Sequence, residues 1–157
     1  MGCSKIGSIM NLLMRLALLA LCVWLLVLSA SAQVELAGCK SYGPAKVALH
    51  GKLVQKTYPG PPNYADVRGG DKAETYWLLK LDSPLCVDAD KAEPDLNPRQ
   101  EDVRVVELVL NEDAYAKYRE FVGKRVVATG SLFGAHTGHH HTPLLLTASD
   151  IQAPRWK

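Results

Sequence analysis

The sequence predicts a mainly β protein, an OB-fold-like, five-stranded barrel with one helix between strands 3 and 4. Three observations predict this fold class. Five segments have apolar residues in strand patterns, one segment of helical periodicity lies between the third and the fourth, and Gly51 interrupts the first strand where a barrel strand has to bend. A small immunoglobulin-like sandwich is the alternative, but that fold needs about seven strands and has no such helix.

The first predicted strand covers residues 45–58. Val47, Leu49 and Leu53 alternate there with polar side chains, which is the period-two pattern of a strand with one buried face. Gly51 lies in the middle of this segment and indicates a bulge or a sharp bend.

The second predicted strand covers residues 75–82, where Trp77 alternates with leucines and is expected in the core rather than on a binding surface. Residues 59–74 join the two strands and are named the proline loop here. Their prolines and glycines predict a long exposed segment. Asp71 and Glu74 at its end could act as a catalytic acid pair. Solvated loop carboxylates are far more common, so we expect these two side chains to be solvated.

A long connection and a third strand follow. Residues 83–102 contain three prolines and six carboxylates, so they predict a connection rather than regular structure. Residues 103–110 are apolar on most of both sides, which predicts a strand covered on both faces.

The predicted helix begins after Asn111, whose side chain is suited to cap it. Glu112 and Asp113 occupy the first turn, where the positive end of the helix dipole favours acidic residues. Apolar residues continue at helical spacing as far as Val122, and Gly123 ends the helix.

The last two predicted strands are residues 125–133 and 143–151. The segment between them, residues 134–142, is named the histidine loop because four of the five histidines of the chain lie in it. In an OB barrel the loop between strands 1 and 2 and the loop between strands 4 and 5 lie beside the same binding face. We therefore expect the proline loop and the histidine loop to form one surface.

The N-terminus predicts a secretory signal peptide over residues 1–32. Positive residues precede an apolar run at residues 16–28, and Ala30 and Ala32 have the spacing of a cleavage site. The run is too short to cross a bilayer, so no transmembrane segment is expected in the mature chain. Translation from Met10 or Met14 instead of Met1 would leave this expectation unchanged.

The mature chain is expected to be one domain, residues 33–157, located in the periplasm or secreted. Its two remaining cysteines, Cys39 and Cys86, predict a disulfide in an oxidising compartment, and they lie before the first predicted strand and after the second. The alternative for Cys39 is a lipidated N-terminus, since residues 36–39 have the form of a lipoprotein box, but polar residues separate that box from the apolar run.

The charge of the mature chain argues against nucleic acid as a partner. The full chain has 18 Lys and Arg residues, of which Lys5 and Arg15 would leave with the signal, and 16 Asp and Glu residues balance the rest. Affinity for nucleic acid depends strongly on neutralising phosphates, and this chain has no surplus of cations for that purpose.

Two interpretations of the histidine loop remain open beside a purely structural turn. In the first, Tyr64, Asn63, Pro61, Pro62 and His140 form a ligand surface with stacking faces and hydrogen-bonding groups but little charge, which suits a glycan, a peptide or another envelope component. In the second, His136, His139 and His141 hold Zn or Cu, because three imidazoles with an open position suit these metals.

Several segments together resemble a family of secreted bacterial proteins known as domain of unknown function 4431. They are residues 59–64 (PGPPNY), Gly70-Asp71, Glu74, Trp77, Cys86-Val87, residues 129–132 (TGSL) and residues 136–141 (HTGHHH). The resemblance implies an exported bacterial domain of unassigned activity and supplies no catalytic residues. The chain has no nucleophile elbow, phosphate-binding glycine loop or HExxH motif, so binding is expected rather than catalysis.

Overall fold

The computed structural model of this protein describes residues 38–155. The predicted signal peptide, residues 1–32, lies outside the described residues. The regular elements are β1 (Lys46–Pro59), the 3-10 turn η1 (Val67–Gly69), β2 (Ala73–Val87), β3 (Gln100–Val109), α2 (Glu112–Tyr118), the 3-10 turn η2 (Arg119–Phe121), β4 (Arg125–Gly134) and β5 (Leu144–Gln152).

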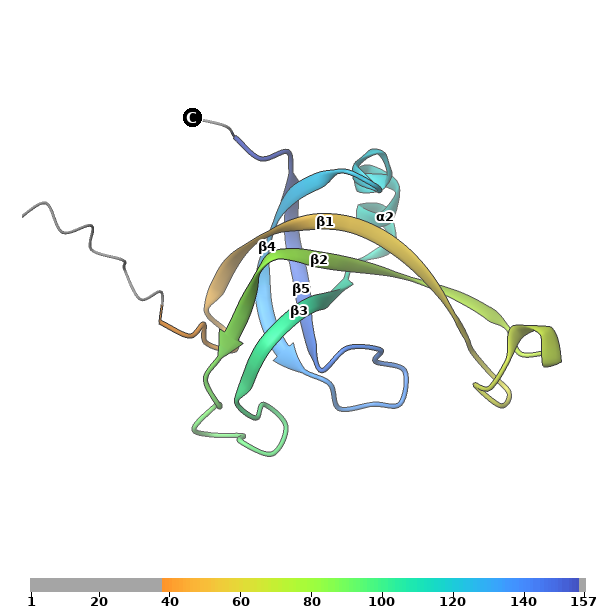
Figure 1. The fold of residues 1–157 in the computed structure, drawn as a ribbon, viewed down its shortest axis with the longest axis horizontal. Coiled ribbons are helices and arrows are strands. Elements are labelled where there is room, and N and C mark those ends of the chain that lie inside the picture. Colours follow the sequence, from red (N-terminus) through yellow and green to blue (C-terminus); the bar gives the residue numbers. More distant parts are fainter. Residues whose placement is uncertain (1–37, 156–157) are drawn as a thin grey trace, which may run out of the picture. The chain divides into compact units, whose positions relative to one another are not determined.

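The five strands close into a barrel in the order β1-β2-β3-β5-β4 (Figure 1). Strand β1 pairs with both β2 and β4, which closes the ring, and β3 and β5 run parallel while the other neighbours are antiparallel. With its helix between β3 and β4, this arrangement confirms the predicted OB-like fold. No helix within residues 38–155 is long and apolar enough to cross a membrane.

Strand β1 passes from one neighbour to the other near Gly51. Residues 46–52 pair with β4 and residues 51–59 pair with β2, so the strand is shared by two parts of the barrel. A Cβ atom at Gly51 would lie 2.3 Å from the carbonyl oxygen of Lys80, which is closer than any side chain tolerates. The sequence signal for a bend therefore marks a place where two strands approach too closely for any residue but glycine.

The barrel interior is filled mostly by leucine and valine, with Trp77 buried among them as predicted. Helix α2 lies at one end of the barrel, and its cap is the predicted one, because the Asn111 side chain accepts a hydrogen bond from the N–H of Ala114. Tyr118 at the helix end is buried, and its hydroxyl donates to Asp150 Oδ1 on β5 at 3.0 Å. The helix and the sheet are thus joined by packing and by a hydrogen bond.

A second buried layer lies outside the barrel on β2, β3 and β5. Leu78, Glu107 and Leu145 are directly opposite one another across the three strands and are at most 4% exposed, although their neighbours along each strand face the interior. The end of the histidine loop covers this face, since Thr142 Oγ1 accepts a hydrogen bond from the Glu107 N–H. Because the histidine loop covers the outer side of β3 and the barrel interior covers the other, β3 is apolar on both sides.

The connection predicted over residues 83–102 is shorter than expected, because β2 continues to Val87 and β3 already begins at Gln100. The register between these strands shifts twice between Lys80 and Val87. Such irregularities accommodate residues that a regular ladder excludes, here Pro84, which has no N–H to donate. The predicted bounds of this connection were wrong, because its prolines and charged residues indicate irregular structure although both of its ends belong to strands.

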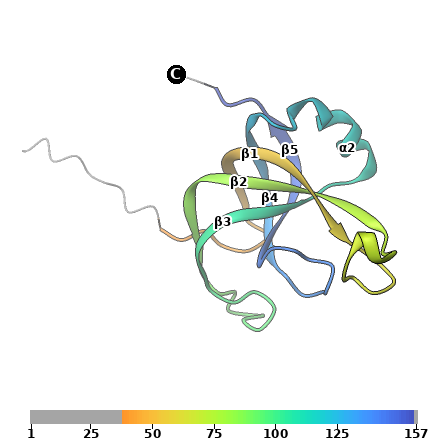
Figure 2. The same ribbon diagram turned by 45° about the vertical axis from the view of Figure 1, so that its right-hand side comes forward.

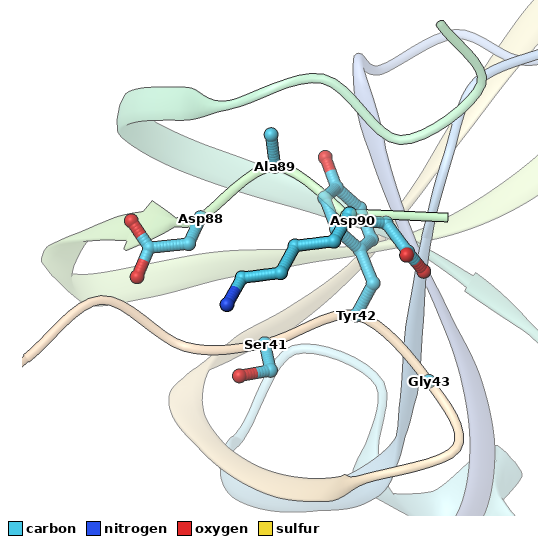
Figure 3. Close-up of a pocket in the computed structure, with 7 residues that line it drawn as sticks. Ser41, Tyr42, Gly43, Asp88, Ala89 and Asp90 are labelled. Carbon is cyan, nitrogen blue, oxygen red and sulfur yellow. The ribbon is translucent and has the colours of Figure 1, made fainter. Parts of the chain in front are cut away.

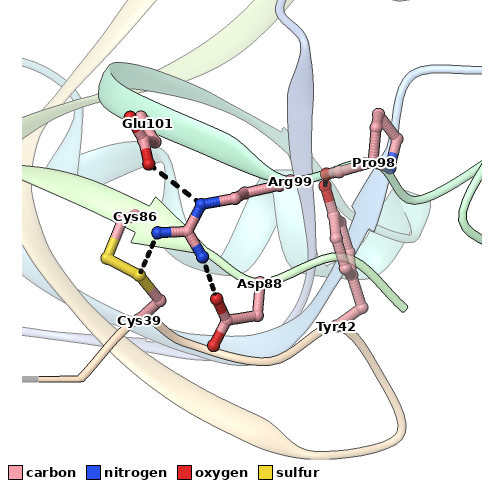
Figure 4. A network of polar contacts seen from close by, with 7 residues as sticks. All are labelled: Cys39, Tyr42, Cys86, Asp88, Pro98, Arg99 and Glu101. Atoms are coloured by element: carbon pink, nitrogen blue, oxygen red, sulfur yellow. Dashed lines mark hydrogen bonds and ion pairs between the residues drawn. A yellow bond between two sulfur atoms is a disulfide. The ribbon is translucent and has the colours of Figure 1, made fainter. Parts of the chain in front are cut away.

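The predicted disulfide between Cys39 and Cys86 is present. Lys40 and Val87 form a bridge beside it, so the segment that leads into β1 is tied to the end of β2. Arg99 joins this region by contacts with Asp88, Glu101 and the Cys39 sulfur, as Figure 4 shows. The ends of both strands are fixed at this pole of the barrel.

Candidate functional site

The proline loop is organised by a single buried carboxylate, that of Asp71. Its two oxygens accept hydrogen bonds from the backbone N–H groups of Asn63, Ala65 and Asp66 at 2.7–2.9 Å. The expectation of a solvated Asp71 was wrong, since the residue is only 6% exposed. The backbone hydrogen bonds from Ala65, Asn63 and Asp66 lower the pKa of Asp71, because they stabilise its charged form.

These hydrogen bonds fix the backbone around Tyr64. This residue has a φ of 57°, in the left-handed region that bulky side chains rarely adopt. Its side chain is nevertheless presented to solvent and is 44% exposed. A residue remains in such a strained backbone conformation only when surrounding contacts impose it, and residues of this kind are common in binding sites.

The histidine loop places its imidazoles in different surroundings. His136 and His140 contact each other, with ring centroids 5.0 Å apart, and the His136 N–H donates to His140 Nδ1. His140 also packs edge-on against Phe133. Burial lowers the pKa of His140; the charge of Glu107 opposes this shift, and the three neighbouring histidines add to it. Its imidazole is thus disposed to be neutral.

The two loops meet, although more than 70 residues separate Tyr64 from His139 in the sequence. The rings of these two residues are 5.3 Å apart. His141 stacks flat on Tyr58, with centroids 3.7 Å apart and planes within 2°, and touches Tyr76 edge-on at 4.4 Å. In Figure 2 the histidine loop and the tip of the β1–β2 hairpin lie toward the same end of the barrel. We call Tyr58, Tyr64, Tyr76, His139 and His141 the aromatic–histidine patch.

Two carboxylates hold the patch in place. Glu107, 3% exposed, accepts a hydrogen bond from the His141 N–H at 2.8 Å. Glu74 accepts one from the Tyr76 hydroxyl at 3.0 Å. Burial, followed by the hydrogen bond and charge of Glu74, raises the pKa of Tyr76 to about 12, so this hydroxyl keeps its proton at physiological pH. The patch therefore combines the exposed ring of Tyr64 with half-buried rings and fixed polar groups.

The three predicted metal ligands do not converge. His136 lies against Phe133 and His140, His139 lies against Tyr64, and His141 lies on Tyr58. Within residues 38–155, no group of three His, Cys, Asp or Glu side chains is arranged to hold a metal ion. Alternation along an extended strand suggested that His139 and His141 share a side, but the segment turns here, with the His140 N–H bonded to the Thr137 carbonyl.

Of the predicted ligand residues, the structure brings Tyr64 into the patch, and Asn63, Pro61 and Pro62 are exposed beside it on the same loop. His140 is directed toward Phe133 instead. Sequence reasoning missed Tyr58, Tyr76 and Glu107. The register between β1 and β2 would have placed Tyr76 beside Tyr58, because Tyr76 lies opposite Lys56 and Tyr58 follows Lys56 by two residues on the same face.

A separate hollow lies at the disulfide pole, lined by Ser41, Tyr42, Gly43, Asp88, Ala89, Asp90 and Lys91 (Figure 3). Two of its polar groups already have partners. The Tyr42 hydroxyl donates to the Pro98 carbonyl at 2.6 Å, and Asp88 pairs with Arg99.

Comparison with known proteins supports the resemblance noted in the sequence. Residues 105–152 match the model of a family described as Domain of unknown function (DUF4431). The matched segment runs from β3 through α2 and β4 to β5, so it includes Glu107 and the whole histidine loop. No curated protein matches the chain significantly.

Proposed function

We propose that this protein is an exported OB-like binding domain that recognises a glycan through the aromatic–histidine patch. The contact between Tyr64 and His139 carries the proposal, because it joins the loops on which an OB barrel most often holds its ligand. Ring faces pack well against the flat C–H faces of sugars. Hydroxyl, imidazole and carboxylate groups at their edges would orient the sugar hydroxyls.

A glycan suits this surface better than an extended peptide does. Peptides are commonly bound by adding a strand to a free sheet edge, and the order of the closed barrel gives each described strand a neighbour on both sides. Free edges remain beside the patch, because residues 54–59 of β1 pair only with β2 and residues 73–76 of β2 pair only with β1. The patch instead offers rings from two loops and the Tyr76–Glu74 hydrogen bond. Binding of a peptide, either along these edges or through its side chains, is the competing outcome that a parallel peptide screen would reveal.

Export is the second part of the proposal. The disulfide between Cys39 and Cys86 supports it, since such bonds persist in oxidising compartments such as the periplasm. The apolar run at residues 16–28 and the Ala30-x-Ala32 spacing agree with a secretory signal. Fractionation of cells that express the tagged protein would place it in the periplasm or the medium, and recovery from the cytoplasm with reduced cysteines would contradict export.

The binding proposal is tested by screening the purified protein against a glycan array and measuring the best ligand by calorimetry. The Tyr64→Ala variant should bind about tenfold more weakly or worse, because it loses a central ring contact. Leu96→Ala is the matched control, since Leu96 is 50% exposed on the loop between β2 and β3. An empty array, or equal affinity of Tyr64→Ala and the unaltered protein, would refute the proposal.

The same protein should be titrated with Zn and Cu in a parallel calorimetric experiment. Our account expects no stoichiometric ion, because the three predicted ligands, His136, His139 and His141, lie against different partners. One tightly bound ion per chain, lost in His139→Ala, would instead support the metal-binding interpretation of the histidine loop.

A further inference from the structure

Three cationic residues lie abreast on the outer face of the barrel. Lys52 on β1 is directly opposite Lys80 on β2 and, on its other side, directly opposite Arg125 on β4. Directly paired residues of antiparallel strands point to the same face, and all three are exposed. We call these residues the cation row; the strands that carry them are adjacent in Figure 1.

The cation row opposes folding rather than supporting it. Like charges directly opposite each other across a sheet are destabilising. Arg125 is partly compensated by Asp82, with 2.7 Å between Nη2 and Oδ2. Neither Lys52 nor Lys80 forms a salt bridge with any acidic residue of the described range. An anionic ligand would remove this repulsion on binding.

The cation row is continuous with the aromatic–histidine patch. Lys52, Val54, Lys56 and Tyr58 follow one another at every second position of β1 and therefore share its outer face. Lys56 Nζ lies 4.4 Å from the centre of the Tyr58 ring, so positive charge already touches the patch. One extended ligand could lie along β1 from the rings to the row.

A hollow adjoins the far end of the row and adds cationic groups to it. Its lining consists of His50, Asp82, Arg125, Val126, Pro154 and Arg155. Arg125 belongs to both the row and the hollow, and Asp82, which it binds, is the one carboxylate in the lining. Arg155 contributes a second guanidinium side chain to this lining.

We propose that the glycan is acidic, with its sugar rings on the aromatic–histidine patch and its negatively charged substituents on Lys52, Lys80 and Arg125. This inference rests on the proposed function and specifies its ligand class. Contacts between a charged donor and an anion are stronger than neutral hydrogen bonds, and one such contact changes affinity by about tenfold. The balance of charges expected in the mature chain is compatible with this local concentration of cations, because 16 of the 18 Lys and Arg residues would remain beside 16 Asp and Glu residues.

The experiment compares acidic oligosaccharides, such as a galacturonic acid hexamer, with the same oligosaccharides after reduction of their carboxyl groups. Affinities are measured by calorimetry at low and high salt. The acidic form should bind at least about tenfold more tightly at low salt, and high salt should remove this advantage by screening. The double variant Lys52→Gln/Lys80→Gln should lose the advantage while it still binds the neutral form.

Lys40→Gln/Lys91→Gln is the charge-matched control, since both lysines are exposed and lie outside the cation row. It should retain the preference for the acidic form. Equal binding of acidic and neutral forms would overturn this inference and leave the proposed function intact. Failure of every oligosaccharide to bind, or tighter binding of a single-stranded oligonucleotide than of any glycan, would refute both proposals.

Discussion

At the scale of single residues, two buried carboxylates determine the geometry of the candidate site. Asp71 binds three N–H groups of the proline loop, and Glu107 binds one N–H group of the histidine loop. Neither interaction is visible in the sequence. Loop carboxylates are usually solvated, and a glutamate within an apolar strand does not reveal which distant backbone group it meets. The residues that shape the site were therefore harder to predict than the rings that compose it.

The Asp71→Asn substitution should loosen the proline loop and release Tyr64 from its strained conformation. An amide accepts with only one oxygen and adds an N–H group where the backbone already donates. Hydrogen exchange at the amides of Asn63, Ala65 and Asp66 should accelerate. Asp66→Asn is the control, because its exposed side chain accepts only from the Arg68 N–H. Unchanged exchange in Asp71→Asn would show that other contacts hold the loop.

The loop should also respond to acid in a defined direction. Because hydrogen bonds lower the pKa of Asp71 below its ordinary value of 3.8, the carboxylate contributes fully above that pH, and its contribution declines as pH falls toward the folded-state pKa. Exchange of the loop amides should therefore remain slow at pH 4 to 5. Acceleration in that range, with the barrel still folded, would contradict the assigned shift.

Glu107→Ala should destabilise the protein by about 1–3 kcal/mol, because it leaves the His141 N–H without its acceptor beneath a covered face. Glu107→Gln keeps an acceptor and should cost less. Urea unfolding measures both, and Glu93→Ala on the exposed loop between β2 and β3 serves as the control. A cost for Glu107→Ala no greater than that of the control would mean that the histidine loop does not depend on this contact.

At the scale of elements, alternation and capping predicted the strands and the helix well. The sequence could not predict where β2 ends, since its irregular second half contains Pro84 among exposed residues. It also could not distinguish a turn from an extended segment around His139 to His141. Local pattern determines the type of an element, but tertiary contacts determine its ends.

Gly51→Ala should destabilise the barrel by at least about 2 kcal/mol, because the added Cβ would meet the backbone of Lys80 and two paired strands cannot separate without losing hydrogen bonds. Gly138→Ala in the histidine loop is the matched control, since no atom lies within 4 Å of its Cβ position. Thermal unfolding of both variants measures the difference. Equal stability would show that β1 does not need its close approach to β2.

Loss of the disulfide should cost about 4 kcal/mol, the loop-entropy value for cysteines 47 residues apart. The double variant Cys39→Ala/Cys86→Ala, compared with the oxidised and the reduced protein in urea, provides the measurement. The variant and the reduced protein should behave alike. A variant as stable as the oxidised protein would indicate that the bridge between Lys40 and Val87 is sufficient.

At the scale of the whole molecule, barrel closure brings together segments that are far apart in the sequence. The order β1-β2-β3-β5-β4 places the β1–β2 hairpin beside the loop that leads into β5, and the aromatic–histidine patch results from this topology. The OB-like fold was predictable from element order alone, and with it the expectation that the loops share a surface. Which rings would touch was not predictable, because that depends on register and loop conformation.

The most direct test of the central claim is a glycan titration of the isotope-labelled protein, followed by NMR at each backbone amide. The account predicts that Tyr58, Tyr64, Tyr76, His139 and His141 shift together and yield one common Kd, because both loops contact the same ligand. Shifts confined to one loop, or centred on Ser41 to Gly43 and Asp88 to Lys91 at the opposite hollow, would contradict it.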